Sequence, residues 1–367
     1  MQNELLCRVA LTLTPHIGPV QAKILIEHFG SAAAVFKARK TDLEKTEGIG
    51  SVRAASLRHF NGWQEAEKEI AFIERYKITP IFLTDPSYPQ RLLNCYDPPT
   101  LLYYRGQAPL NTTCIISIVG TRYKTDYGRQ LTETLVQGLA PYSVTIVSGL
   151  ALGIDAIAHK SALKNGLPTI GVLAHGLDKI YPSEHKALAK DMLRHGGGLL
   201  TEFRHATAPD KHHFPRRNRI VAGISDATIV VETDVKGGSM ITAQLAFDYN
   251  RDVFAFPGRT TDAKSAGCLH LVRSLRATMI TGPDDLAIAL GWLSEAPPVA
   301  KKQRELFTAL TGEEQKIVQL LEESDSLPID DLNLRAGLSA SQVAAALLSL
   351  EMQQLVTSLP GKRYRLN

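Results

Sequence analysis

Six short runs of apolar and β-branched residues recur between residues 114 and 256, and they constrain the fold more than any other feature of the sequence. They cover residues 114–119, 144–147, 169–173, 198–201, 228–231 and 253–256. Amphipathic segments long enough for helices lie between most of them, such as 128–139 and 154–163. Apolar strands that alternate with helices are typical of a parallel sheet covered on both faces. Ligands of such sheets bind at the carboxyl ends of the strands, so we expect functional residues in the loops that follow these runs.

The first 75 residues predict a set of short helices with two similar turns. Residues 16–22 and 48–54 each have a glycine at a tight turn and an alanine in the helix that follows. This is the pattern of a helix-hairpin-helix in a SAM-like helical domain, whose turn directs helix N-terminal amides outward, where they bind phosphate. The first copy has His16 where the second has Gly48. A small helical bundle with glycine C-caps explains the pattern equally well.

Two proline-rich segments divide the chain. Residues 80–110 predict an irregular connector with short extended pieces, and residues 296–302 predict a linker of proline and lysine. We therefore expect an α/β chain of three domains: a helical domain over 1–75, an extended Rossmann-like domain over 80–292 and a further domain over 305–367.

The last of these domains has the outline of a winged helix: helix, turn, second helix and a short hairpin. Ser339 or Ser341 is expected to cap the second helix. Because only Arg335 lies near that helix, contact with DNA, contact with a protein and a plain scaffolding role all stay open.

Composition excludes several classes of protein. The apolar fraction of 44% and charged fraction of 21% are those of a folded chain, and no apolar run approaches the length of a membrane span. The four cysteines form no CxxC pair, so neither a zinc site nor a disulfide framework is predicted, and no cofactor is expected. Reduced thiols and an N-terminus without the features of a leader favour a cytoplasmic protein. A net charge of +4 is too small to predict nucleic-acid binding by itself.

The first two loops after predicted strands suit a phosphate. Gly120, Thr121 and Arg122 follow the first run: the glycine allows close approach, the threonine offers a hydroxyl, and the arginine can hold a phosphate through two N–H groups. Ser148 and Gly149 begin a second loop that leads into a helix, where an anion is favoured.

That second loop is followed by two titratable residues, Asp155 and His159, one turn apart on the predicted helix. Their pairing in a structural role is favoured over a catalytic dyad. The glycine spacing is not that of a dinucleotide-binding loop, and no suitable acid for a ribose follows it, so a dehydrogenase is not predicted.

The third loop carries most of the positive charge. Residues 211–219 contain four basic residues, two histidines and no acid, with an aromatic ring among them. Such a ring beside guanidinium groups stacks bases while the charges neutralise the backbone, although Phe214 also suits a plain anchor to the core. The candidate DNA contacts here are Lys211, Phe214, Arg216, Arg217, Asn218 and Arg219.

Two further loops add phosphate-compatible groups. Gly238 and Ser239 follow the fifth run as a double glycine and a serine that opens a helix, and Pro257, Gly258 and Arg259 follow the sixth. These loops contain no Ser-His-Asp set, no close pair of free carboxylates and no P-loop. Strong binding groups without a catalytic group favour a binding protein over an enzyme.

Several of these motifs together resemble the DNA-processing protein A family, also called DprA or Smf. The resemblance rests on residues 119–122, 148–159, 214–223 and 256–258, which occur in the family's order, and it covers about residues 80–290. Residues 88–89 and 97–99 also fit the family's pattern. One departure is Leu269, which stands where the family's Gly-Cys-Asn motif has asparagine, so a polar contact from that position is in doubt.

The resemblance implies a Rossmann-like domain that forms a homodimer and binds single-stranded DNA. It also implies loading of the RecA recombinase onto that strand in natural transformation, with displacement of single-strand-binding protein. Carried over by position, Arg122 and a loop over 214–219 would contact DNA, while Gly120, Ser148, Gly149, Gly238 and Ser239 would shape the pocket.

Two alternatives remain. Nucleoside-monophosphate phosphoribohydrolases resemble this fold, but their Pro-Gly-Gly-x-Gly-Thr loop is followed by a catalytic glutamate that is absent from residues 237–244. A transcription regulator that reads DNA through the C-terminal domain would prefer duplex and a particular sequence.

Overall fold

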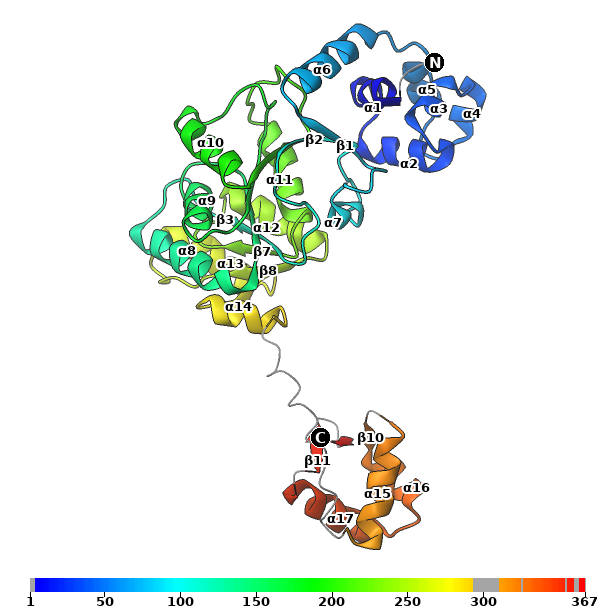
Figure 1. Ribbon diagram of the computed structural model, residues 1–367, viewed down its shortest axis with the longest axis vertical. Helices are drawn as coiled ribbons and strands as arrows, with labels where there is room; N and C mark the ends of the chain where they lie inside the picture. Colours follow the sequence, from blue (N-terminus) through cyan, green and yellow to red (C-terminus); the bar gives the residue numbers. More distant parts are fainter. Residues whose placement is uncertain (1–3, 293–309, 325, 354, 360–362, 367) are drawn as a thin grey trace. The chain divides into compact units, whose positions relative to one another are not determined.

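The computed structural model describes residues 4–292, 310–324, 326–353, 355–359 and 363–366 (Figure 1). The chain divides into two compact units, Met1–Leu293 and Ser294–Asn367. The linker expected over 296–302 lies outside the described residues. The N-terminal helices and the sheet fall within one compact unit, and the domain boundary expected near residue 75 stays a prediction.

The first unit is built on a sheet with nine strands in its described part, ordered β1-β2-β6-β5-β4-β3-β7-β8-β9. Strands β3 to β9 run parallel, while β2 pairs antiparallel with β6 and with β1. The six predicted runs match β3 to β8 within one or two residues, which confirms them. The strands are β1 (Thr79–Phe82), β2 (Leu101–Gly106), β3 (Ile115–Val119), β4 (Thr145–Ser148), β5 (Thr169–Val172), β6 (Gly198–Thr201), β7 (Ala227–Val230), β8 (Asp252–Ala255) and β9 (Thr278–Met279).

The strand order reverses at β3. From β3 the chain adds β4, β5 and β6 on one side, then returns to place β7, β8 and β9 on the other. The loops that leave the carboxyl ends of β3 and β7 therefore diverge, and a crevice opens between them. This switch point is where open α/β sheets bind their ligands.

Helices cover both faces because successive residues of a strand point to opposite sides. Ile116 and Ile118 pack with α8 (Asp126–Leu139), α9 (Ile154–Lys164) and α14 (Pro283–Ala289). Ile115 and Val119 belong to a second core with α11 (His213–Gly223), α12 (Gly238–Asp248) and α13 (Ala266–Arg273). A smaller cluster joins α9 to α10 (Lys186–Arg194).

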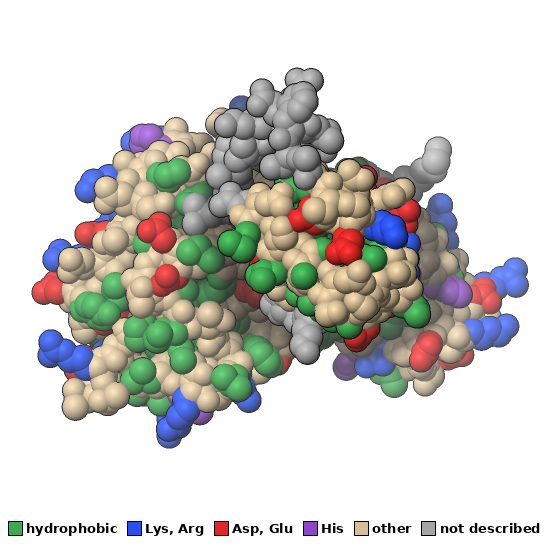
Figure 2. Space-filling model, turned by 90° about the horizontal axis from the view of Figure 1, so that it is seen from below, with side chains coloured by type: hydrophobic (Ala, Val, Ile, Leu, Met, Phe, Trp, Pro, Cys, Tyr) green, Lys and Arg blue, Asp and Glu red, His purple; other side chains and the backbone are tan. Residues whose placement is uncertain are grey.

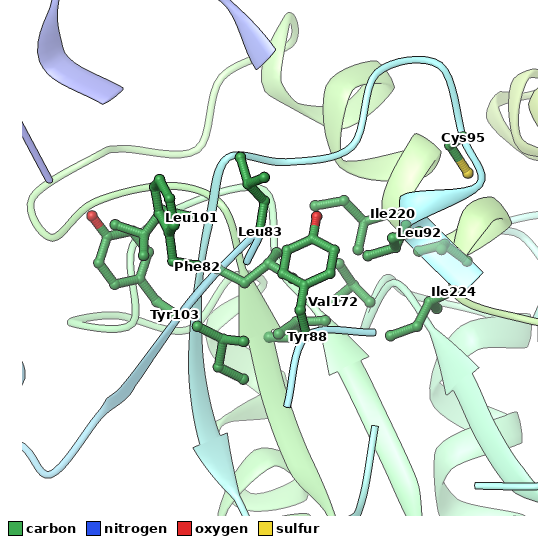
Figure 3. Close-up of a cluster of buried hydrophobic side chains, with 14 of the residues drawn as sticks. Phe82, Leu83, Tyr88, Leu92, Cys95, Leu101, Tyr103, Val172, Ile220 and Ile224 are labelled. Carbon is green, nitrogen blue, oxygen red and sulfur yellow. The ribbon is translucent and has the colours of Figure 1, made fainter. Parts of the chain in front are cut away.

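The second core continues without a break into the N-terminal helices, which gather at the β1–β2 edge of the sheet (Figure 1). Figure 3 shows part of it: Phe82, Tyr88 and Leu101 lie with Val172 of β5 and Ile220 of α11. An ion pair between Arg8 and Asp85 (2.8 Å) adds to this packing. The helices are α1 (Glu4–Leu13), α2 (Pro19–Phe29), α3 (Ala32–Lys37), α4 (Lys40–Lys45), α5 (Ser51–Arg58), α6 (Trp63–Arg75) and, in the proline-rich connector, α7 (Gln90–Leu93).

The two predicted hairpin turns each have a residue in the left-handed region of the backbone. His16 (φ 65°) and Gly48 (φ 77°) both lie in the left-handed region, which glycine adopts freely and histidine rarely. Arg53 donates to the carbonyl oxygens of Gly48 (2.7 Å) and His16 (3.3 Å), so one side chain joins the two turns. The similarity between residues 16–22 and 48–54 is therefore a structural repeat.

The second unit is a winged helix, as predicted. It contains α15 (Gly312–Glu322), α16 (Ile329–Ala336) and α17 (Ala340–Met352), with β10 (Leu327–Pro328), β11 (Val356–Leu359) and β12 (Arg363–Leu366) in one small sheet. Gly337 (φ 63°) makes the turn between α16 and α17, and Ser339 caps α17 by accepting a hydrogen bond from the amide of Gln342 (3.4 Å). Arg335 is paired with Glu323 at 2.7 Å.

Charges of both signs lie interspersed on the face of the molecule shown in Figure 2. Together with the net charge of +4, this means that any anion site depends on local placement. In the described ranges, no helix combines the length and the apolar character needed to cross a membrane.

Candidate nucleic-acid interface

A cavity of about 530 Å³ opens at the switch point, between the loops after β3, β4 and β7. The first turns of α11 and α12 complete its wall. The structure brings most of the predicted site residues to this one place: Gly120, Thr121, Arg122, Gly149, Lys211, Phe214, Arg217, Asn218, Gly238 and Ser239 all line it. Ser148, Arg216 and Arg219 do not.

Arg122 projects over an aromatic ring. Its guanidinium carbon lies 5.2 Å from the centre of the Phe214 ring, which belongs to the first turn of α11. The loop that carries Arg122 is fixed from both sides, because the amide of Thr121 donates to the carbonyl of Glu232 (2.7 Å) and its carbonyl accepts from the amide of Ile154 (3.2 Å). A fixed loop with an exposed guanidinium on a ring presents charge and a stacking surface together.

Arg217 forms the floor of the cavity and is buried. Its guanidinium donates to the carbonyl oxygens of Gly149 and Val172, at the ends of β4 and β5. Asp155 accepts from the amides of Gly149 (3.0 Å) and Ala151 (3.4 Å). Burial raises the pKa of Asp155 and lowers that of Arg217 to about 10, and the attraction between their charges opposes both shifts. Arg217 therefore remains charged at neutral pH and joins two strand ends.

Residues 214–219, expected as a loop, belong to α11, and its helical turn separates the arginines. Successive helical residues point about 100° apart, so Phe214, Arg217 and Asn218 reach the cavity while Arg216 and Arg219 point away. Arg219 is buried against Glu202 (2.5 Å) and Asp97 (3.6 Å). The four arginines thus do not converge on one pocket, and the DNA contact of Arg216 and Arg219 stays a prediction.

Three other positions singled out in the sequence have internal roles or lie elsewhere. Ser148 is buried and donates to the carbonyl of Ile118 (2.7 Å), so it shapes the strand ends from within the sheet. Leu269 lies on α13 and does not line the cavity. Arg259 lines a neighbouring cavity of about 750 Å³, together with Glu232 and Lys264.

Sequence reasoning missed two residues with a cationic or aromatic side chain that line the switch-point cavity, Lys264 and Tyr123. The Lys264 ammonium lies 5.7 Å from the centre of the Tyr123 ring, which repeats the pairing of Arg122 with Phe214. Lys264 comes shortly after the Pro257-Gly258-Arg259 loop, whose basic residue was the signal available. Tyr123 follows Arg122 directly and is 81% exposed. Its position in the sequence alone does not predict a stacking role.

The predicted pairing of Asp155 with His159 is wrong. Asp155 is bound to backbone amides, and His159 shares a hydrogen bond with the hydroxyl of Thr169 (2.6 Å). Since the Thr169 hydroxyl donates to the carbonyl of Ile146 (2.9 Å), the imidazole is the donor to it. Among the described residues, no group of three or more His, Cys, Asp or Glu side chains is placed to hold a metal ion.

Burial gives His159 an effect on stability that depends on pH. Burial, helped by the charges of His185 and Arg217, lowers its pKa from 6.5 to about 3. Between these two pH values only the unfolded chain protonates His159, so its stabilising contribution is complete above pH 6.5 and is lost as pH falls toward 3. The loss is about 1.4 kcal/mol per pH unit.

The variant His159→Leu should flatten this dependence. Between about pH 6.5 and about pH 5.5, the native chain should lose about 1 kcal/mol more unfolding free energy than the variant does, because the unfolded histidine is already half protonated at the upper pH. Urea titrations followed by circular dichroism at the two pH values measure both losses. Equal losses would contradict the assignment, because every other titrating group is common to the two proteins.

Residues 79–291 match the family described as DNA recombination-mediator protein A, and this range includes every residue that lines the cavity. The chain belongs to the DNA recombination-mediator protein A family. Residues 297–362 match the family's winged-helix domain, described as DprA winged helix domain.

Three relatives show how similar this member of the DNA recombination-mediator protein A family is to known proteins. Protein Smf of Synechocystis sp. is 33% identical over 390 residues, which cover 95% of each chain. The X-ray structure of DNA processing protein A from Streptococcus pneumoniae has a TM-score of 0.67 and 31% identity, and covers 79% of this chain and 98% of that one. A structure on the single-stranded DNA binding mode of DNA processing protein A from Helicobacter pylori has a TM-score of 0.53 and 33% identity, and covers 58% and 96%.

Proposed function

We propose that this chain binds single-stranded DNA, with little sequence preference, in the cavity at the switch point of its sheet. The observation that carries the proposal is the exposed Arg122 guanidinium over the Phe214 ring, with Lys211 and Lys264 on the same cavity wall. The single-stranded DNA binding mode described for the Helicobacter pylori relative supports it.

The chemistry of the wall suits a strand more than a duplex. Guanidinium and ammonium groups neutralise phosphates, while Phe214 and Tyr123 offer rings on which unpaired bases stack, and every base has a face that stacks. Asp155, the buried acid of the wall, is already bound to amides, and the positive charge of Arg217 favours its charged form. Asp234 is the other acid of this wall.

We propose in addition that the chain acts in natural transformation as a cytoplasmic homodimer. In this role it protects incoming single strands, displaces single-strand-binding protein and loads RecA, and it has no catalytic activity of its own. The family membership supports these proposals. The rate of ATP hydrolysis by RecA on a strand coated with single-strand-binding protein tests the loading step, and a rate that this chain does not raise would contradict it.

Titration of labelled oligo-dT against a duplex of equal length tests the binding proposal. Fluorescence anisotropy should show the single strand bound at least about tenfold tighter, because stacking requires unpaired bases. The logarithm of affinity should fall with the logarithm of salt concentration by about 0.7 per phosphate neutralised.

Two results would instead favour the alternatives. Preference for a duplex of particular sequence would support a regulator that reads DNA through α16 and α17. Release of free base from AMP would support a phosphoribohydrolase.

A further inference from the structure

The cavity at the switch point is called the first cavity from here on. A second cavity, of about 510 Å³, lies apart from it, between the first N-terminal hairpin and the residues that follow the carboxyl end of β6. Ile17, Gly18 and Pro19 line it from the hairpin, and Arg204 and Arg216 line it from the opposite side. Both walls belong to the same compact unit. The hairpin turn and Arg216 therefore line the same cavity. Both were predicted to bind nucleic acid, and neither lines the first cavity.

The sheet side of this cleft carries exposed cations over an aromatic ring. The Arg216 guanidinium carbon lies 5.1 Å from the centre of the Phe203 ring, and its side chain is 56% exposed. Arg204 is 46% exposed and pairs with Glu65 at 2.6 Å. With Phe203 beneath it, the planar guanidinium of Arg216 offers its outer face to a base and its N–H groups to a phosphate.

Glu202 adds an acceptor that the protein leaves unused. Its side chain is 6% exposed, and Oε2 binds Arg219 (2.5 Å) and Arg216 (3.4 Å). Oε1 is buried and has no hydrogen-bond partner among the described residues. Because an unpaired buried acceptor is unfavourable, a donor brought by a ligand would be favoured here. Exposed bases offer N–H donors on their Watson–Crick edges.

Helix α11 forms a wall of both cavities. Phe214, Arg217 and Asn218 line the first, and His213 and Arg216 line the second. The two sets lie on adjacent faces of the start of this helix, so only the width of the helix separates the cavities there. A strand that crosses the start of α11 passes from one cavity into the other.

We propose that this cleft is a second nucleotide subsite for the same single strand. Arg216 and Arg204 hold a phosphate, a base stacks on the Arg216 guanidinium and donates to Glu202 Oε1, and the first hairpin closes the opposite side. The inference rests on the proposed binding of single-stranded DNA in the first cavity, and it gives the N-terminal hairpin a direct part in that binding.

Strand length distinguishes the two sites. A short oligo-dT of about six nucleotides fits the first cavity, whereas one of about twenty reaches both. Arg216→Ala should weaken binding of the long strand about fivefold to tenfold and leave the short one unchanged. Thr12→Glu, which puts a carboxylate on the exposed hairpin side of the cleft, should act in the same way through repulsion of phosphate. Fluorescence anisotropy measures all of these affinities.

Matched controls are Arg194→Ala on α10 and Thr41→Glu on α4, both exposed and outside the cleft. They should bind both lengths like the native chain, and circular dichroism verifies folding of every variant. Unchanged binding of the long strand by both cleft variants would overturn the inference, and so would equal weakening at both lengths. The proposed function fails separately, if the native chain binds neither strand or if Arg122→Ala weakens neither.

Discussion

Replacing Arg122 by alanine is expected to weaken binding of single-stranded DNA at least tenfold, a loss of about 1.4 kcal/mol or more. The substitution removes a phosphate-binding group and the cation over Phe214. Because neither of these reads a base edge, the loss should be similar for all sequences, and the slope against salt should fall by about 0.7 for each phosphate that is no longer neutralised. Anisotropy titrations of oligo-dT and a mixed-sequence strand at several salt concentrations measure both effects.

Folding should not be affected by this change. Arg122 is exposed and its charge opposes that of buried Arg217, so its removal relieves repulsion. Arg194→Ala, an exposed arginine 73% accessible at the end of α10, is the matched control and should bind like the native chain. If Arg122→Ala and Arg194→Ala bind oligo-dT equally well, the assignment of the first cavity to DNA is wrong.

The second large effect is expected on stability, from Arg217→Met. Methionine has similar length but no charge, so the variant leaves Asp155 buried without its cation and the carbonyls of Gly149 and Val172 without their donor. Each buried carbonyl oxygen left without its donor costs about 1–3 kcal/mol, and loss of the cation near Asp155 adds to this. Total stabilities of domains are about 5–15 kcal/mol, so a large fraction would be lost. Urea unfolding followed by circular dichroism measures it.

Arg194→Met is the control for this substitution, because the side chain it removes is exposed. It should change the unfolding free energy by less than about 0.5 kcal/mol. A variant Arg217→Met as stable as the control, with binding of DNA abolished, would show that Arg217 serves the ligand and not the junction of β4 and β5.

The sequence predicted the sheet well because β3 to β8 are buried on both faces. A strand in that position has no solvated side, so apolar residues such as Ile115, Ile116 and Ile118 point to both faces. Arg122 was predictable for a related reason. A polar residue directly after such a run must lie at the carboxyl edge, whatever the order of the strands.

The basic segment 211–219 was harder to interpret because its geometry depends on where α11 begins. A run of charges is usually solvated, yet Arg217 and Arg219 are buried and Arg216 is exposed. The partners that allow this burial, Asp155 and Glu202, are distant in sequence, and only the fold brings them close. Lys264 could not be predicted for the same reason, since its approach to Tyr123 is a property of the assembled loops.

The winged helix and the N-terminal helices differ in whether they have a hydrophobic core of their own. The winged helix has a core of its own, made of residues of the second unit such as Ile317, Leu332 and Val343. The N-terminal helices share their core with the sheet, since α1 packs on β2 and Phe82 and Leu101 belong to the same cluster. A descendant that dropped those helices would need new, polar side chains along this edge. Among the described residues, the core clusters of the first unit therefore contain no residue of the winged helix, whereas they include residues of the N-terminal helices.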